Sequence, residues 1–438
     1  MKFAILNIIG ILFISQIVWA QKPIIRNLKE CIEIAVANNP LLRQQELKTK
    51  RNKIQYNQAW QNQLPTMNAN LGHGYNQGRT IDPTTNQFVE QNISSGNQSL
   101  NTSMILFDGM RILSDIRMKA NAKVAGRLEY EGEINVLKLN VIEAYINVLT
   151  AQDMLDQGEK QWELTKQQYE RSSVLNREGA ISPSSYYDVR GQYNLELNNL
   201  QIISQTLYSN RLKLANLLNC PEAELGTLAD VDLEVDENNN YTDWDMLYEQ
   251  ARLILPEYRA FGARVKEAQQ GIKVAQSGYF PRLSLGAGMN SNYSSYVNGN
   301  YYTQVKNNLG KYLSFSLSIP IFTGFVVRNQ VRLAKINLQD VTFDQERRLN
   351  ELRMNTSKAV FDLHSSREQV LNLQEQEKSY AELHRISKVQ FEEGATNSVD
   401  YLTAKNKWDS SKNQLIMKKY QMLFQQYLND YYAGKLNL

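Results

Sequence analysis

The sequence predicts a mixed, mainly α fold, with long antiparallel α-helical hairpins and two β-hairpins per chain. Three observations lead to this prediction. Landmarks of the first half recur in the second at an offset of 215 or 216 residues, which indicates an internal duplication. Two proline-free stretches, 110–178 and 325–393, keep a helical pattern that would extend for about 100 Å at about 1.5 Å per residue. Four segments alternate apolar with small polar residues, the period of β-strands.

Residues 1–20 have the composition of a secretory signal peptide. Lys2 precedes an apolar run, and Val18 and Ala20 stand at the −3 and −1 positions of a cleavage site, so the mature chain would begin near Gln21. No later stretch approaches the roughly 20 apolar residues that a membrane-spanning helix needs. The segment therefore predicts export from the cytoplasm and would not be part of the mature fold.

The first repeat, residues 21–219, is predicted to contain three helices and one β-hairpin. Asn39-Pro40 predicts a kink or a short break, because proline disfavours a helical conformation at the residue before it. Residues 77–97, rich in Asn, Gly, Thr, Ser and Gln, predict a loop. The predicted elements are helix 28–62, strands 66–76 and 98–107, long helix 110–178 and helix 184–219.

The second repeat, residues 244–432, follows an acidic connector at 220–243 that contains Asn238–Asn240. Leu255-Pro256 stands where Asn39-Pro40 stands in the first repeat, and residues 294–308 predict a second loop. The predicted elements are helix 244–277, strands 282–293 and 310–321, long helix 325–393, helix 398–432 and a tail at 433–438.

The strands need an apolar environment on one face, and the flanking helices are too long to fold back as a cover. A transmembrane β-barrel supplies lipid outside and water inside. Four strands cannot close a barrel, because about eight is the smallest number known. A dimer would supply eight strands and a trimer twelve, and a four-stranded sheet in a soluble protein remains the alternative.

Each long helix ends in a turn with the same residues. Glu178, Gly179, Ala180 and Tyr186 recur as Glu393, Gly394, Ala395 and Tyr401. Glycine ends helices, and Ser, Thr or Asn begins them. In each repeat the two shorter helices together are about as long as the long helix, so they can stack end to end beside it. The turns would then form two tips at the end of the helices that lies far from the strands. We expect a partner to dock at Gly179, Ala180, Ile181, Ser182, Gly394, Ala395, Thr396 and Asn397.

If the two short helices of the first repeat stack end to end, the two cysteines would lie close together. Cys31 lies near the start of one short helix and Cys220 just past the end of its stacking partner. An oxidising compartment would allow a disulfide between them. Two separate thiols are the alternative, because disulfide geometry is demanding.

The sequence offers no catalytic or cofactor chemistry. The three histidines show no metal-ligand spacing, and His364 and His384 are expected on solvated helix faces. No paired acids, nucleophile or phosphate-binding loop stands out, so we expect neither an enzyme, nor a metal, nor a cofactor. The net charge of +3 gives no argument for nucleic acid.

Taken together, the signal peptide, the two-fold repeat, Leu106-Phe107-Asp108-Gly109 after a hairpin and the paired turns resemble the TolC outer membrane efflux protein family. The resemblance covers essentially the whole mature chain. It implies a homotrimer in the outer membrane, with a twelve-stranded β-barrel continued by an α-helical barrel in the periplasm. It also implies docking onto a periplasmic adaptor and an inner-membrane transporter, for export of small toxic compounds. The alternatives are a conduit for type I protein secretion and a periplasmic coiled-coil scaffold without a pore.

The resemblance also suggests a gate near the tips. When the sequences are aligned on Gly394, one acidic gate position of the family falls on Asp400. A second falls on Thr403 and the family's nearby arginine on Thr396, so the pattern is only partly present. In the first repeat the matching position is Ser185, with Asp188 one turn later. Asp400 and Asp188 are the candidate gate residues, and an acid favoured by the helix dipole is the alternative for Asp400.

Overall fold

The computed structural model describes residues 25–231 and 243–436. The predicted signal peptide and residues 232–242 of the acidic connector lie outside the described residues. The chain forms two units, which are described separately below. Unit 1 comprises the chain up to Arg43, Ile134–Ala251 and the chain from Met354; unit 2 comprises Gln44–Glu133 and Arg252–Arg353.

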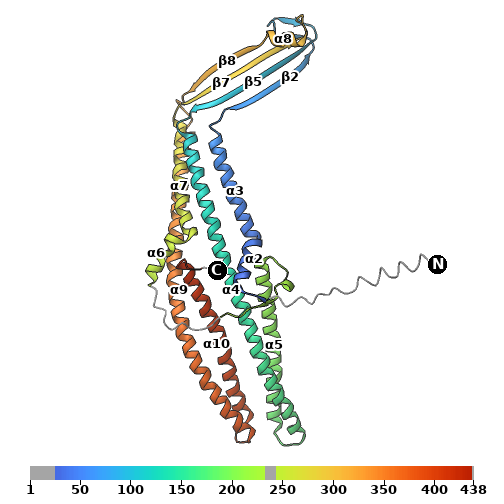
Figure 1. Ribbon diagram of the computed structural model, residues 1–438, viewed down its shortest axis with the longest axis vertical. Helices are drawn as coiled ribbons and strands as arrows, with labels where there is room; N and C mark the ends of the chain where they lie inside the picture. The colour runs from blue at the N-terminus through green and yellow to red at the C-terminus, as the bar shows by residue number, and fades with distance from the viewer. Residues whose placement is uncertain (1–24, 232–242, 437–438) are drawn as a thin grey trace, which may run out of the picture. The chain divides into compact units, whose positions relative to one another are not determined.

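Unit 2 contains a four-stranded antiparallel sheet in the order β2-β5-β7-β8 (Figure 1). The central pair, β5 and β7, joins the two repeats, with Leu100 opposite Met289. The strands β2 and β8 are the two edges of this sheet. The bounds are β2 (Thr66–Asn76), β5 (Ile93–Phe107), β7 (Arg282–Ser294) and β8 (Gly310–Ser318).

One face of the sheet exposes large apolar side chains. Leu71 on β2 is 82% exposed, and Phe315 on β8 is 66% exposed. Alternation along the strand places such residues on one face and small polar residues on the other. Within the described chain, nothing covers Leu71 or Phe315, so this face needs an apolar environment from outside the chain.

The predicted loops 77–97 and 294–308 contain regular structure. The first holds the hairpin of β3 (Arg79–Ile81) and β4 (Phe88–Glu90) together with the start of β5, and the second holds α8 (Tyr301–Asn307). Local side chains stabilise both segments: Asp82 Oδ1 accepts from the Thr85 amide at 2.7 Å, and Asn300 Oδ1 accepts from the Thr303 amide at 2.8 Å. Polar residues that bond the nearby backbone resemble loop residues in a sequence, which explains both differences.

Two strand ends also differ from the prediction. β5 begins at Ile93 rather than 98, because its polar first residues pair on both sides, Asn76 opposite Ile93 and Ser294 opposite Ser95. Backbone pairing does not require alternating polarity, so the sequence pattern missed these residues. β8 ends at Ser318 rather than 321, since Pro320 has no N–H to donate to the ladder.

The helices of unit 2 lead away from one end of the sheet (Figure 1). They are most of α3 (Pro40–Gln61), the first part of α4 (Arg111–Arg177), α7 (Pro256–Gln276), which the short helix η2 (Ser277–Tyr279) follows, and the first part of α9 (Val326–Glu392). Arg264 on α7 binds Glu129 on α4 through two hydrogen bonds of 2.7 and 2.9 Å. This planar pairing fixes the rotation of α7 against α4.

Unit 1 contains the remaining parts of α4 and α9 and several shorter elements. These are β1 (Ile25–Arg26), α2 (Leu28–Asn38), α5 (Pro183–Leu218), η1 (Glu222–Glu224), β6 (Thr227–Leu228), α6 (Trp244–Ile254) and α10 (Ser398–Tyr432). The predicted break at Asn39-Pro40 separates α2 from α3, and the Asn39 side chain accepts from the Leu41 amide at 2.9 Å. Leu255-Pro256 separates α6 from α7 in the same way.

The centre of unit 1 is apolar and includes one buried tyrosine. Ile32, Ile142 and Leu214 are fully buried, and so is Tyr145 on α4. The Tyr145 hydroxyl donates to the Ala229 carbonyl at 2.6 Å, and its burial raises the pKa of Tyr145 well above the usual range. Together these contacts hold the described start of the connector against α4. No helix in the described residues is both long and apolar enough to cross a membrane.

Candidate functional site: the two helical tips

Both tips have the backbone of a helix end closed by glycine. Gly179 and Gly394 have φ angles of +68° and +75°, the left-handed region that favours glycine. In the first tip the Ala180 amide donates to the Leu175 carbonyl at 2.8 Å, and the Ala395 amide makes the equivalent bond in the second at 2.7 Å. These bonds span six residues, as in a Schellman motif. Both turns lie at the same end of unit 1 (Figure 1).

The next helix begins at a polar cap in each tip. Ser182 Oγ accepts from the Ser185 amide at 3.2 Å, and Asn397 Oδ1 accepts from the Asp400 amide at 2.9 Å. Such caps satisfy amides that have no partner inside the helix. Six of the eight predicted docking residues are exposed, while Ile181 and Thr396 are half-buried. The predicted docking residues therefore form two exposed turns, in which small residues precede the polar cap.

The two candidate gate acids occupy different environments. Asp400 is exposed, and its Oδ2 accepts from the Thr396 hydroxyl at 3.0 Å and the Asn397 amide group at 3.1 Å. Asp188 on α5 instead accepts from the Ser398 hydroxyl on α10 at 3.0 Å. Asp400 is thus held within its own turn at a helix N-terminus, where the dipole favours a carboxylate, whereas Asp188 joins the two hairpins.

Each hairpin carries a stack of rings directly above its tip. Tyr169 on α4 lies between Tyr186 and Tyr193 on α5, with ring centroids 6.1 and 5.0 Å away. In the second hairpin His384 on α9 lies between Tyr401 and Trp408 on α10, at 5.9 and 4.7 Å. The offset of 215 residues relates each ring of the second set to one of the first. The repeat offset could therefore have identified these residues, although only the tyrosines 186 and 401 were matched across the repeats from the sequence.

The position of His384 corrects the expectation of a solvated histidine. Its ring is half-buried against Trp408, and its Nε2 atom is buried without a hydrogen-bond partner among the described residues. Burial, helped by the charge of Lys405, lowers the pKa of His384 to about 4. The histidine is therefore neutral near pH 7 and belongs to the hairpin's packing. The polar residues around it in the sequence concealed this role.

Polar residues also join α5 to α10 further from the tips. Lys405 Nζ lies 2.7 Å from Glu196 Oε1 and 2.7 Å from Asp409 Oδ2. Gln192 Nε2 donates to Glu196 Oε1 at 2.8 Å and to Asn406 Oδ1 at 3.0 Å. We call these five side chains, Gln192, Glu196, Lys405, Asn406 and Asp409, the polar clasp. Nothing in the sequence singles out these five residues, because Lys405 and Glu196 lie 209 positions apart and meet only when α5 contacts α10.

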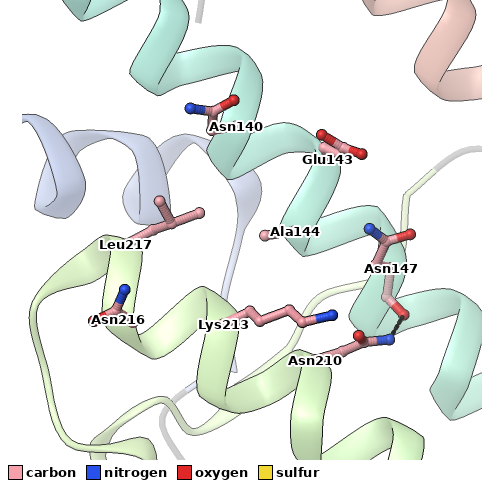
Figure 2. A pocket seen from close by; sticks show the side chains of 8 residues that line it. All are labelled: Asn140, Glu143, Ala144, Asn147, Asn210, Lys213, Asn216 and Leu217. Carbon is pink, nitrogen blue, oxygen red and sulfur yellow. Dashed lines mark hydrogen bonds between the residues drawn. The ribbon is translucent and has the colours of Figure 1, made fainter.

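Each hairpin also has a groove along its length. Figure 2 shows the groove of about 410 Å³ between α4 and α5, where the Asn210 side chain donates to the Asn147 carbonyl at 3.1 Å. A groove of about 550 Å³ lies between α9 and α10. Both are lined mainly by polar side chains. The first is lined by Asn140, Glu143, Ala144, Asn147, Asn210, Lys213, Asn216 and Leu217.

The predicted disulfide is not formed: Cys31 and Cys220 are both free thiols. The end of α5 bonds to the far end of α2, where the Asn39 side chain donates to the Leu217 carbonyl at 3.1 Å. Cys31 lies about two turns back along α2, with its side chain fully buried. Burial raises the pKa of the Cys31 thiol to about 11, which keeps it protonated and unreactive. In the part of the chain that the structure describes, no group of three or more His, Cys, Asp or Glu could hold a metal ion.

Comparison with known proteins gives one consistent result. The model of the outer membrane efflux protein family matches residues 31–220 and 247–427. Outer membrane protein TolC of Salmonella enteritidis is 22% identical over 94% of this chain and 82% of its own length. TolC of Escherichia coli K12 is 25% identical over 71% of this chain, which spans 62% of that relative's length.

The fold agrees with that of solved outer-membrane channels. The crystal structure of the Campylobacter jejuni CmeC outer membrane channel has a TM-score of 0.82 at 17% identity, over 93% of this chain and 86% of that chain. The mainly α architecture with two β-hairpins is thereby confirmed. The family match covers most of both repeats and leaves out the two ends of the chain and the connector from residue 221 onward. This chain belongs to the outer membrane efflux protein family.

Proposed function

We propose that three copies of this chain form one passive channel, in which a twelve-stranded β-barrel in the outer membrane continues as an α-helical barrel through the periplasm. The observation that carries this proposal is the four-stranded sheet of unit 2. Its edge strands β2 and β8 are both open to another copy, and its apolar face is uncovered. Closing the sheet with further copies removes the edges, and lipid would cover the apolar face.

The order of the strands fits such closure. β2, β5, β7 and β8 alternate in direction, so β8 of one copy would run antiparallel to β2 of the next. Three copies give an even number of strands that all alternate. Two copies would give eight strands, whose interior is filled by side chains, whereas twelve leave room for a passage.

The long helices carry apolar stripes that support the same assembly. Phe343, Met354 and Phe361 on α9 are all exposed, and the last is 71% exposed. Spacings of 11 and 7 residues keep them on one face of the helix. Leu47 and Ile54 on α3 are likewise exposed and seven residues apart. Such faces suit packing against the helices of neighbouring copies.

The tips are the proposed contact with the rest of the export apparatus. We infer that a periplasmic adaptor docks at the predicted docking residues and along the grooves of the two hairpins. The turns are exposed, and the grooves offer amide side chains that can bond to a partner helix. An inner-membrane transporter would supply the energy through that adaptor. Asp188, which joins α5 to α10, is the stronger of the two gate candidates.

Small toxic compounds are the proposed cargo. The family covers export systems as a class, and protein secretion through the same fold is the competing assignment for the cargo.

Deletion of the gene in its native host tests this function most broadly. Sensitivity to dyes, detergents, antibiotics and metal salts should rise, and a plasmid copy should restore resistance. Loss of a secreted protein from the medium with unchanged sensitivity would instead assign the chain to protein secretion. Extraction adds a second readout: a channel should leave the membrane fraction only with detergent, whereas release by salt alone would indicate a scaffold without a pore.

A further inference from the structure

The polar clasp is unusual because it buries a lysine between two helices. Lys405 is 3% exposed and Glu196 is 8% exposed. Lys405 contacts one carboxylate on each helix, that of Glu196 on α5 and that of Asp409 on α10, both at 2.7 Å. Burial disfavours the charged form of Asp409 and raises its pKa. The clasp thus has a considerable desolvation cost.

An apolar contact would join the two helices at least as firmly. Replacement of a buried ion pair by packed apolar residues is often neutral or stabilising by about 1–4 kcal/mol. Removal of one partner alone typically costs about 3–5 kcal/mol, since the remaining charge is left buried. An intact buried ion pair therefore adds little stability, whereas an incomplete one is costly. Such a cluster is suited to selecting which surfaces pair.

The selection problem is built into this chain by its duplication. α5 and α10 are the same element of the two repeats, as the tyrosines at 186 and 401 show. The clasp, however, is not repeated. The offset of 215 places Ser411 where α5 has Glu196, and the exposed Arg190 where α10 has Lys405. The two helices have therefore diverged at the residues that join them.

This divergence discriminates between possible pairs of helices. When α10 meets α5, Lys405 finds Glu196 across the contact, and Gln192 finds Asn406. If α10 met another α10 in the same register, Lys405 would face Ser411 instead of a carboxylate. Glu196 would then be absent from the contact, and Lys405 would keep only Asp409 of its own helix. A buried lysine with half its partners missing is strongly disfavoured.

We propose that the polar clasp is a pairing determinant, which makes α5 the partner of α10 and excludes contacts between two α10 helices when hairpins of several chains assemble. The inference rests on the proposed function in one respect, namely that several copies of the chain share one assembly. Its effect is on which helices meet; the clasp touches no cargo. Lys405 acts through Glu196 and is a positioning residue.

Disulfide trapping in the full-length chain can read the pairing directly. Cys31 and Cys220 are first changed to Ser. Asp188→Cys with Ser398→Cys reports contact of α5 with α10, because these side chains meet outside the clasp at 3.0 Å. Ser398→Cys alone reports contact between α10 helices of two chains. Membranes of producing cells are oxidised and the chains are separated without reductant.

With the clasp intact, the double-cysteine chain should cross-link α5 to α10, and the single-cysteine chain should yield few linked pairs. Lys405→Met should raise the yield of α10–α10 pairs at least about tenfold, as expected from the cost of breaking a buried pair. Glu196→Lys combined with Lys405→Glu should return it toward the parent value. Lys407→Met, outside the clasp on the exposed face of α10, is the matched control.

Two outcomes would overturn the proposal. One is a melting temperature lowered by Lys405→Met with no rise in α10–α10 pairs, which would make the clasp a stabilising contact only. The other is failure of the charge exchange to restore pairing. Failure of the assembly itself is seen separately: chains with two different tags would not co-purify, while the α5–α10 cross-link within one chain would still form.

Discussion

The glycines of the two tips offer the sharpest test of the docking surface. We expect Gly179→Val combined with Gly394→Val to abolish export while assembled channels persist. An L-residue in the left-handed region costs about 1–2 kcal/mol, and both positions have φ angles in that region. No atom lies within 4 Å of a Cβ built at either glycine. The cost is therefore backbone strain, which the turn can relieve by changing its shape.

The size of this strain energy decides whether the variant chains still fold and assemble. Two substitutions together amount to about 2–4 kcal/mol, less than the roughly 5–15 kcal/mol that holds a typical domain. The chains should therefore fold and assemble, but with altered turns. Asn tolerates the left-handed conformation better than other residues, so Gly179→Asn with Gly394→Asn is the matched control and should retain most export.

Three measurements in one strain separate the possibilities. They are the resistance that each variant restores to a deletion strain, the amount of assembled channel on unheated gels, and the cross-linking of the tips to an adaptor. The valine pair should lose resistance and cross-linking at a normal amount of channel. Full resistance in the valine pair, or an equal loss in the asparagine pair, would refute the assignment of these turns as the docking surface.

Three further predictions concern stability and assembly. Tyr145→Phe removes a hydroxyl that is fully buried and bonded to the Ala229 carbonyl, so it should cost about 1–2 kcal/mol in thermal unfolding; an unchanged melting temperature would contradict that role. The pKa of His384, lowered to about 4 from 6.5, makes the folded hairpin bind fewer protons than the unfolded chain, so stability should be present above pH 6.5 and decline as the pH falls toward 4. His384→Gln should flatten this decline in melting curves, and an identical pH profile would exclude the histidine as its source. Phe361→Asp places a charge on the exposed stripe of α9 and should reduce assembled channel on unheated gels without unfolding the chain; an unchanged amount of assembled channel would contradict the role of the stripe.

The internal repeat, the long helices and the central parts of the strands could be predicted from the sequence, because each leaves a regular pattern of residues along the chain. The proline-free stretches correspond to α4 and α9, and Asn39-Pro40 marks the end of α2. The alternation of apolar and polar residues predicted the central parts of the strands. The polar start of β5 has no such alternation and was taken for a loop, since its order comes from pairing on both sides.

The candidate site was only partly readable, because its decisive contacts join residues far apart in the sequence. Gly179 and Gly394 follow from local turn chemistry. Lys405 and Glu196 are ordinary helix residues in the sequence and become a buried pair only when α5 meets α10. Helix stacking likewise could not decide whether Cys31 and Cys220 are bonded, and both are free thiols.

The native mass of the detergent-solubilised protein tests the central claim, a barrel shared between copies, most directly. Four strands with open edges on β2 and β8 predict that the intact particle contains three chains. Native mass spectrometry of the mature protein, released from its detergent micelle in the gas phase, counts those chains. A single species of three chains is the predicted result. A particle of one or two chains would contradict the twelve-stranded barrel and the channel built on it.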